Sequence, residues 1–343
     1  MVLIAVSLGA LAVGALTPPA VQAVELANSA TVSGSATGVL TYLEGTTKIQ
    51  LVWLDRAGKR LGTLGDPGRY YGPIVLSPDD SRVAVQIMAE NGQHDIWVVD
   101  VARGLASRVT TGPPQSFRPV WSPDGRELIF QGGPDSGDLY RKELRAGATA
   151  LSLLETDERE YPQDWSRDGK ILLYRTTGEE NALWALPLGG DGSPELVLKT
   201  GSSLSESQMS PDGRRLAFSS RRDGYWNLYL LTPDGEVTQV TDDTAYDGAP
   251  AWSPDGGRIA FVSTREGYAE IYILPVAGGE PINISNAPYS SEHGPTWSPD
   301  GGRLAFYSDR DGEWDIYVMT SDGADAIKLT GENSIDQVPA WRP

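Results

Sequence analysis

The sequence predicts an all-β fold made of repeated four-stranded units. The chain has 343 residues, which exceeds the usual size of a single compact core, and its 39 Gly and 24 Pro are spread among short apolar runs. One turn phrase, in full Ser-Pro-Asp-Gly, recurs every 43 to 45 residues, with serines at Ser77, Ser122, Ser166, Ser210, Ser253 and Ser298. Repeats of this length with four short strands are typical of the blades of a β-propeller.

Each unit is predicted to contain four strands in a fixed order. The first strand ends at the turn phrase, as in residues 248–253 ("GAPAWS"), and the fourth is short, as in residues 237–241 ("VTQVT"). The second is a mostly apolar triplet that occurs seven times, at residues 40–42, 83–85, 128–130, 172–174, 216–218, 259–261 and 304–306. The third also occurs seven times, at residues 50–55, 95–100, 138–143, 182–187, 227–232, 270–275 and 315–320.

The turn phrase has a conformational reason. Pro presets φ at the second turn position, Asp hydrogen-bonds nearby groups, and Gly supplies the positive φ that closes a hairpin. The aromatic residue before it is large and apolar, so we expect the five tryptophans at this position to pack between neighbouring blades. They are Trp121, Trp165, Trp252, Trp297 and Trp341.

The seven copies of the second and third strands predict seven four-stranded antiparallel blades, with six as the alternative if the first unit is irregular. A closed ring leaves no strand edge exposed. We expect the C-terminal residues 336–343 ("DQVPAWRP") to supply the inner strand of the blade that begins near residue 38.

The chain start predicts export. Residues 1–16 carry no charged side chain, and Val21 and Ala23 have the spacing of a signal-peptidase site, although the usual Lys or Arg before the apolar stretch is missing. We therefore divide the chain into a signal peptide or membrane anchor (1–23), a linker (24–37) and a propeller (38–343). The predicted location is periplasmic or secreted, with a membrane-anchored propeller outside the cell membrane as the alternative.

Composition excludes several functions. The net charge is −18, so a nucleic acid is a poor partner, and the membrane is expected to be reached only through an uncleaved N-terminal anchor. The chain has no Cys and only two histidines, which excludes thiolate metal sites and disfavours a histidine-rich metal centre. It has no Gly-x-Ser-x-Gly nucleophile motif either.

The repeat wording resembles a known family. The pattern P-x-WSPDG-x-x-[IL]AF followed by [DN][IL]Y resembles the TolB-type, WD-like propeller repeats of bacterial periplasmic proteins, beyond residue 38. Residues 35–45, 51–85 and 95–104 are also similar to the extracytoplasmic propeller region of bacterial transmembrane serine/threonine kinases, but the chain has no kinase motif. The resemblance implies a sensor or docking module.

The loops that enter the first strands are the predicted binding face. The spacing places four carboxylates in equivalent positions and aromatic residues beside them, so we expect an acidic mouth around the central channel. The predicted binding residues are Tyr71, Phe117, Glu160, Tyr161, Asp247, Glu292, His293 and Asp336.

These observations together predict a non-enzymatic, extracytoplasmic, TolB-like propeller that binds a protein or peptide with basic groups, or senses a ligand. No catalytic residue and no metal site are assigned. No cofactor is expected, with a channel cation such as calcium as the alternative. The alternative function is a propeller enzyme, either polysaccharide lyase-like or hydrolase-associated, with a metal in the central channel.

Overall fold

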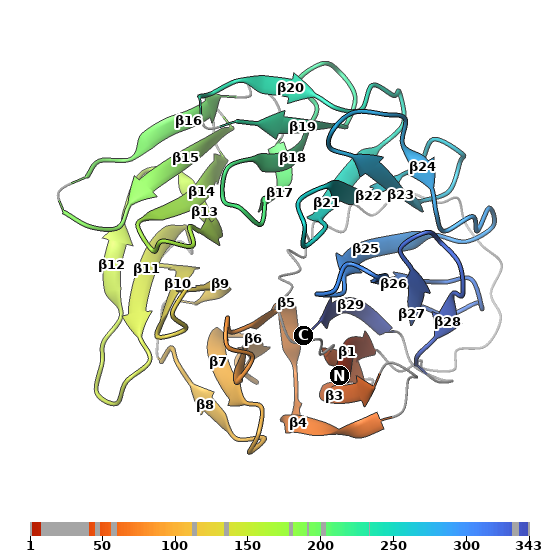
Figure 1. Ribbon diagram of the computed structural model, residues 1–343. Coiled ribbons are helices and arrows are strands. Elements are labelled where there is room, and N and C mark those ends of the chain that lie inside the picture. Colours follow the sequence, from red (N-terminus) through yellow and green to blue (C-terminus); the bar gives the residue numbers. More distant parts are fainter. Residues whose placement is uncertain are drawn as a thin grey trace, which may run out of the picture.

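The computed structural model shows a ring of antiparallel β-sheets (Figure 1). It describes residues 2–7, 41–44, 49–55, 60–111, 115–133, 137–177, 181–190, 192–199, 204–232, 234–330 and 336–341. Six sheets contain four strands each, and within every one of them the strands follow in chain order. The first strand of each lies nearest the centre of the ring and the fourth lies at the outside (Figure 1). The prediction of a propeller with four-stranded antiparallel blades is therefore confirmed.

We number the six blades I to VI along the chain. Blades I to III consist of β5 (Tyr70–Leu76), β6 (Arg82–Met88), β7 (His94–Asp100) and β8 (Ala106–Arg108); β9 (Phe117–Trp121), β10 (Glu127–Gly132), β11 (Asp138–Glu143) and β12 (Leu151–Leu154); and β13 (Arg159–Trp165), β14 (Ile171–Thr177), β15 (Ala182–Pro187) and β16 (Glu195–Lys199). Blades IV to VI consist of β17 (Leu204–Met209), β18 (Leu216–Ser220), β19 (Asn227–Leu231) and β20 (Val237–Gln239); β21 (Asp247–Trp252), β22 (Arg258–Ser263), β23 (Glu270–Pro275) and β24 (Ile282–Asn283); and β25 (Glu292–Trp297), β26 (Arg303–Ser308), β27 (Asp315–Thr320) and β28 (Ile327–Lys328).

The predicted number of seven such blades is corrected to six. The remaining sheet, which we call the closing sheet, has five strands: β1 (Val2–Ser7), β2 (Thr41–Glu44), β3 (Ile49–Asp55), β4 (Arg60–Gly68) and β29 (Asp336–Trp341). The C-terminal strand β29 joins this sheet as expected, but it pairs with β1 and not with β2. Because β1 lies between β3 and β29, the repeated four-strand order is lost here.

Strand β1 lies within the predicted leader. Val2–Ser7 forms this strand, and the rest of the predicted leader and linker, residue 1 and residues 8–37, lies outside the described residues. No helix among the described residues is long and apolar enough to cross a membrane. Cleavage after Ala23 would remove β1, so the leader prediction and this strand pairing can be tested against each other.

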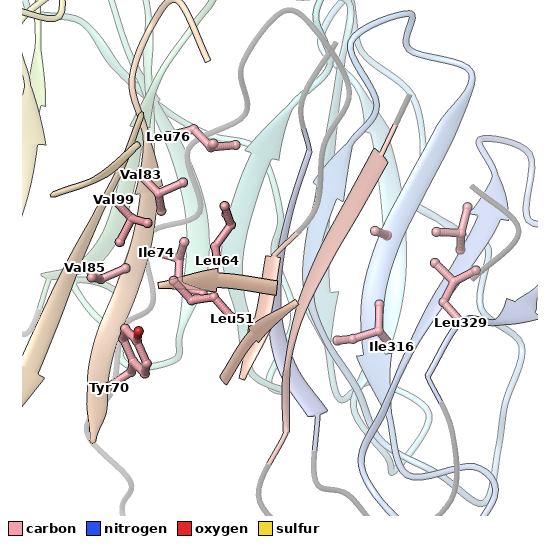
Figure 2. Close-up of a cluster of buried hydrophobic side chains, with 12 residues drawn as sticks. Leu51, Leu64, Tyr70, Ile74, Leu76, Val83, Val85, Val99, Ile316 and Leu329 are labelled. Carbon is pink, nitrogen blue, oxygen red and sulfur yellow. The ribbon is translucent and has the colours of Figure 1, made fainter. Parts of the chain in front are cut away.

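Buried side chains between the sheets hold the ring together. One apolar cluster joins Leu51 and Leu64 of the closing sheet to residues of blade I and to Ile316 and Leu329 on the side of blade VI (Figure 2). Five further clusters each combine residues of two successive blades. The apolar core is thus divided among the junctions between sheets, so the inner strands can use their other side chains near the ring axis.

Four of the predicted anchor tryptophans fill these junctions. Trp121, Trp165, Trp252 and Trp297 are 4% to 6% exposed, and three of their indoles donate hydrogen bonds to the preceding blade. Trp121 donates to the carbonyl oxygen of Val75 at 2.9 Å, for example, and the Arg82 guanidinium lies 5.1 Å from its ring centroid. Their structural role is confirmed, while the side chain of Trp341 lies outside the described residues.

The turn phrase closes the hairpin between the first two strands of each blade. In blade V, Ser253 Oγ donates to Asp255 at 2.5 Å and accepts the Arg258 N–H at 2.9 Å. Gly256 has φ +68°, the left-handed conformation that the sequence pattern predicted. Asp80 takes this place in blade I with φ +59°, which Asp tolerates better than most residues.

Candidate functional site

Each first strand contains a β-bulge near the centre of the ring. In blade III the pairing with β14 shifts between Pro162 and Asp164, and the first strands of the other five blades shift at matching places. Positive φ angles mark the bulges at Arg118 (52°), Glu206 (35°), Ala249 (52°) and Gly294 (59°). A bulge turns a side chain out of its regular alternation, and left-handed residues other than Gly are concentrated at functional positions. The bulges therefore locate the candidate site.

Strand register places the predicted aromatic residues together. Tyr71, Phe117 and His293 form the last pair before the bulge of their strands, and Tyr161 holds the matching place in blade III, where one more pair, Pro162 with Tyr174, precedes the shift. Spacing in the sequence had instead aligned Tyr71 with the predicted carboxylates, which come one residue before the aromatic position. The bulge of blade I holds one more residue than the others, which moves Tyr71 into the aromatic position.

Three of the predicted carboxylates are enclosed within their own blades. Glu160, Asp247 and Glu292 are each 0% exposed. Asp247 accepts two hydrogen bonds from Arg265, at 3.0 and 3.2 Å, and Glu292 accepts one from Arg310 at 3.2 Å. These carboxylates therefore form no exposed acidic mouth.

Glu160 differs from the other two buried carboxylates in its hydrogen-bond partner, and the fourth predicted carboxylate, Asp336, is described only by its backbone. Glu160 accepts a hydrogen bond from Thr156 Oγ1, and burial raises the pKa of Glu160 to about 7. Asp336 begins β29, but its side chain lies outside the described residues.

Two arginines instead approach one tyrosine near the ring axis. The guanidinium of Arg175 lies 4.3 Å from the ring centroid of Tyr161, and that of Arg118, from the neighbouring blade, lies 5.2 Å away. Burial, followed by the charge of Arg118, lowers the pKa of Arg175 to about 10, and burial also lowers the pKa of Arg118. Two partly buried cations thus contact one shared aromatic ring.

One carboxylate, Glu206, interacts through its charge with Arg175 of this pair. It accepts a hydrogen bond from the Ala249 N–H at 2.6 Å and one from Tyr246 Oη at 3.2 Å. Burial raises the pKa of Glu206, while the charge of Arg175 acts in the opposite direction. Burial and then the charge of Glu206 raise the pKa of Tyr307, which places this ring in the same electrostatic neighbourhood.

We call these residues the axial cluster. Its members come from blades II to VI and are linked to one another by the ring contacts, hydrogen bonds and charge interactions described above. They are Arg118, Tyr161, Arg175, Glu206, Tyr246 and Tyr307.

Both histidines belong to aromatic groups beside the axial cluster. His94 contacts Tyr71 and Phe117 with ring centroids 5.1 and 5.0 Å apart. His293 stacks on Tyr307 at 5.5 Å and lies 5.6 Å from Trp314. Burial lowers the pKa of both imidazoles, which favours neutral rings at pH 7. The site is thus rich in aromatic surface as well as charge.

Sequence reasoning found part of this site and missed the rest. Phe117, Tyr161 and His293 were predicted, whereas Arg118, Glu206 and Arg175 were not. The available signal was position, because Arg118 directly follows Phe117 and Arg175 is the register partner of Tyr161. Within the described residues, no three His, Asp or Glu side chains are grouped so as to hold a metal ion. The prediction about cofactors remains untested.

Comparison with known families agrees with the fold. Residues 191–292 match the family described as the TolB beta propeller domain. The structure of a TolB-like protein from Agrobacterium tumefaciens superposes with a TM-score of 0.54 at 24% identity, covering 70% of this chain and 94% of that one. The propeller domain of the Trilobed protease from Pyrococcus furiosus superposes with a TM-score of 0.66 at 16% identity, covering 88% and 98%.

A curated relative corrects one expectation. A protein of Bacillus subtilis named as an uncharacterized peptidase, YuxL, is 36% identical over 185 residues, which are 51% of this chain. The chain spans only 27% of that relative's length. Because this relative is named as a peptidase, the expectation that the chain is not an enzyme is overturned.

The match to the family model and the shared fold agree with the repeat wording in the sequence. The similarity to kinase-linked propellers remains a prediction. The resemblance to the TolB-type propeller repeats is therefore confirmed by the match over residues 191–292, and the chain folds as a β-propeller.

Proposed function

We propose that this TolB-like propeller binds a polypeptide segment that carries a carboxylate, and that the axial cluster is the binding site. The observation that carries the proposal is the pair Arg118 and Arg175 on one tyrosine ring, with the pKa of Arg175 lowered to about 10. Two cations held together in a partly desolvated place are stabilised by an added anion. A guanidinium pair suits a carboxylate because each can donate two parallel hydrogen bonds.

The surrounding residues support a peptide as the ligand class. Phe117, Tyr161 and Tyr307 supply aromatic surface, which interacts well with apolar side chains, and Glu206 offers an acceptor for a backbone or side-chain N–H. The peptidase relative supports the same class of ligand. The basic partner predicted from the sequence relied on carboxylates of which three are buried, whereas the charges near the axis favour an acidic one.

An extracytoplasmic location belongs to this proposal. It is supported by the uncharged N-terminal stretch and by the TolB-type repeats. Intact-mass measurement on the exported protein tests it, because cleavage at the predicted site leaves Val24 as the first residue. A protein that retains Met1 inside the cell contradicts it.

The binding proposal is tested on a peptide array. Peptides containing Asp and Glu are compared with otherwise identical peptides containing Asn and Gln, and with peptides containing Lys and Arg. The wild-type protein should prefer the acidic set. In the double variant Arg118→Gln and Arg175→Gln this preference should disappear, because the variant loses both cations.

The matched control removes two arginines from the surface. Arg126→Gln and Arg145→Gln cause the same change in net charge, and these side chains are 84% and 71% exposed. The control should bind like the wild type. Equal loss of binding in both double variants, or a preference for the basic peptides, contradicts the proposal.

A further inference from the structure

At five junctions between successive blades, the residue before the turn serine of the second blade lies at the junction. One of these five junctions differs from the other four. The residue before the turn serine is Trp121, Trp165, Trp252 or Trp297 at four junctions, but it is Met209 at the junction of blades III and IV. At those four the buried indole belongs to the apolar cluster that joins the two blades. Met209 is only partly buried against its cluster.

The methionine also lacks the interactions that hold an indole in place. Trp252 donates its indole N–H to the carbonyl of Gln208 at 3.0 Å, and Arg215 lies 5.5 Å from its ring centroid. Methionine has no N–H to donate. Arg215 lies five residues after the turn serine of its blade, Ser210. At the Met209 junction the corresponding residue, five after Ser166, is Ile171, which is 39% exposed.

A pocket of about 350 Å³ opens at this junction. This volume is at the small end of the range for small-molecule sites. Its apolar lining comes from both blades, and Arg214 and Asp234 add exposed charged groups. The apolar residues that line it are Leu173, Leu183, Leu196, Val197, Met209, Leu216 and Leu231.

We propose that this pocket binds a small aromatic molecule of the size of indole. The structure itself shows what the junction accepts, because four equivalent junctions of the same fold are filled by indole rings. Leu196 is 46% exposed beside the pocket, so a ligand there would cover apolar surface that is now in contact with water. Met209 is flexible and can adapt to a flat ring. The pocket is separate from the axial cluster.

The experiment uses indole as the probe and isothermal titration of the full chain. The wild type should bind one indole. In Met209→Trp the chain's own indole should occupy the junction, so binding should weaken by about tenfold or more. The same variant should unfold at a higher temperature, because it restores the packing of the other junctions.

A second variant keeps the test independent of core repacking. Leu196→Asp places a charge beside the pocket at an exposed position and should also weaken indole binding about tenfold. Its matched control is Leu151→Asp, since Leu151 is an exposed leucine on the outer strand of blade II, 66% exposed, and is not part of the pocket. The control should bind indole like the wild type. Absence of indole binding to the wild type, or unchanged binding in Leu196→Asp, overturns the proposal.

Discussion

The buried ion pair of blade V should be essential for stability because removing its cation leaves an enclosed charge. Asp247 is 0% exposed and Arg265 is 20% exposed, and the guanidinium donates to both carboxylate oxygens at 3.2 and 3.0 Å. The same guanidinium lies 4.8 Å from the ring centroid of Tyr272. Arg265→Met retains an apolar stem but removes the charge.

The expected magnitude follows from these contacts. Leaving a buried carboxylate without its partner costs about 3–5 kcal/mol. Loss of the contact with Tyr272 adds about 0.5–1 kcal/mol. Arg265→Met should therefore lower the free energy of unfolding by about 3.5–6 kcal/mol. The double variant Asp247→Asn with Arg265→Met should lose less than the sum of the single variants, because it leaves no buried charge.

Equilibrium unfolding in urea, followed by circular dichroism and by tryptophan fluorescence, measures both quantities. The control is Lys170→Met, which removes one partner of a pair with Asp168 at 3.2 Å whose side chains are 78% and 55% exposed. This change should alter the free energy of unfolding by less than about 0.5 kcal/mol. A loss below about 1 kcal/mol in Arg265→Met, or strictly additive single and double variants, would refute the reasoning.

Three further outcomes are expected. Because burial raises the pKa of Glu160 from its ordinary 4.5 to about 7, the folded protein holds a proton that the unfolded chain releases, and stability should fall as pH rises through that window. Glu160→Gln should flatten this dependence, measured by urea unfolding at about pH 5 and about pH 8, and an unchanged slope counts against it. Trp297→Phe should lower the free energy of unfolding by about 1 kcal/mol, because the hydrogen bond to Ala251 is lost, and Trp297→Ala should lower it by about 3–5 kcal/mol, because a cavity is left. Equal losses in the two variants would contradict this expectation. Gly294→Ala should lower the free energy of unfolding by about 1–2 kcal/mol, because φ is +59° and the new Cβ would lie 2.7 Å from Tyr307 Cε1. Peptide binding should weaken as well. Unchanged stability and unchanged peptide binding would show that the bulge relaxes freely.

The sequence by itself determined the repeating unit. The turn phrase, the apolar triplet and the third strand each lie within one period, and their preferences are local: Pro and Gly specify the turn, and alternating apolar residues specify a half-buried strand. The anchor tryptophans could be predicted for the same reason, since a large apolar side chain that recurs at the same place in four of the six blades is expected to be buried in each of them. The exception at Met209 is also visible in the sequence, but the pocket beside it is visible only in the structure.

The tertiary structure decided which residues face the ring axis and how the ring closes. A bulge of one or two residues changes the direction of the side chains that follow it, and sequence spacing does not reveal it, so Arg118 and Glu206 of the site were not predicted. The pairing of Asp247 with Arg265, 18 residues apart, depends on strand register in the same way. At the closure, β29 pairs with β1, which lies far from it in the chain. Local preferences specify the blades, whereas register and edge pairing depend on contacts between residues far apart in the chain.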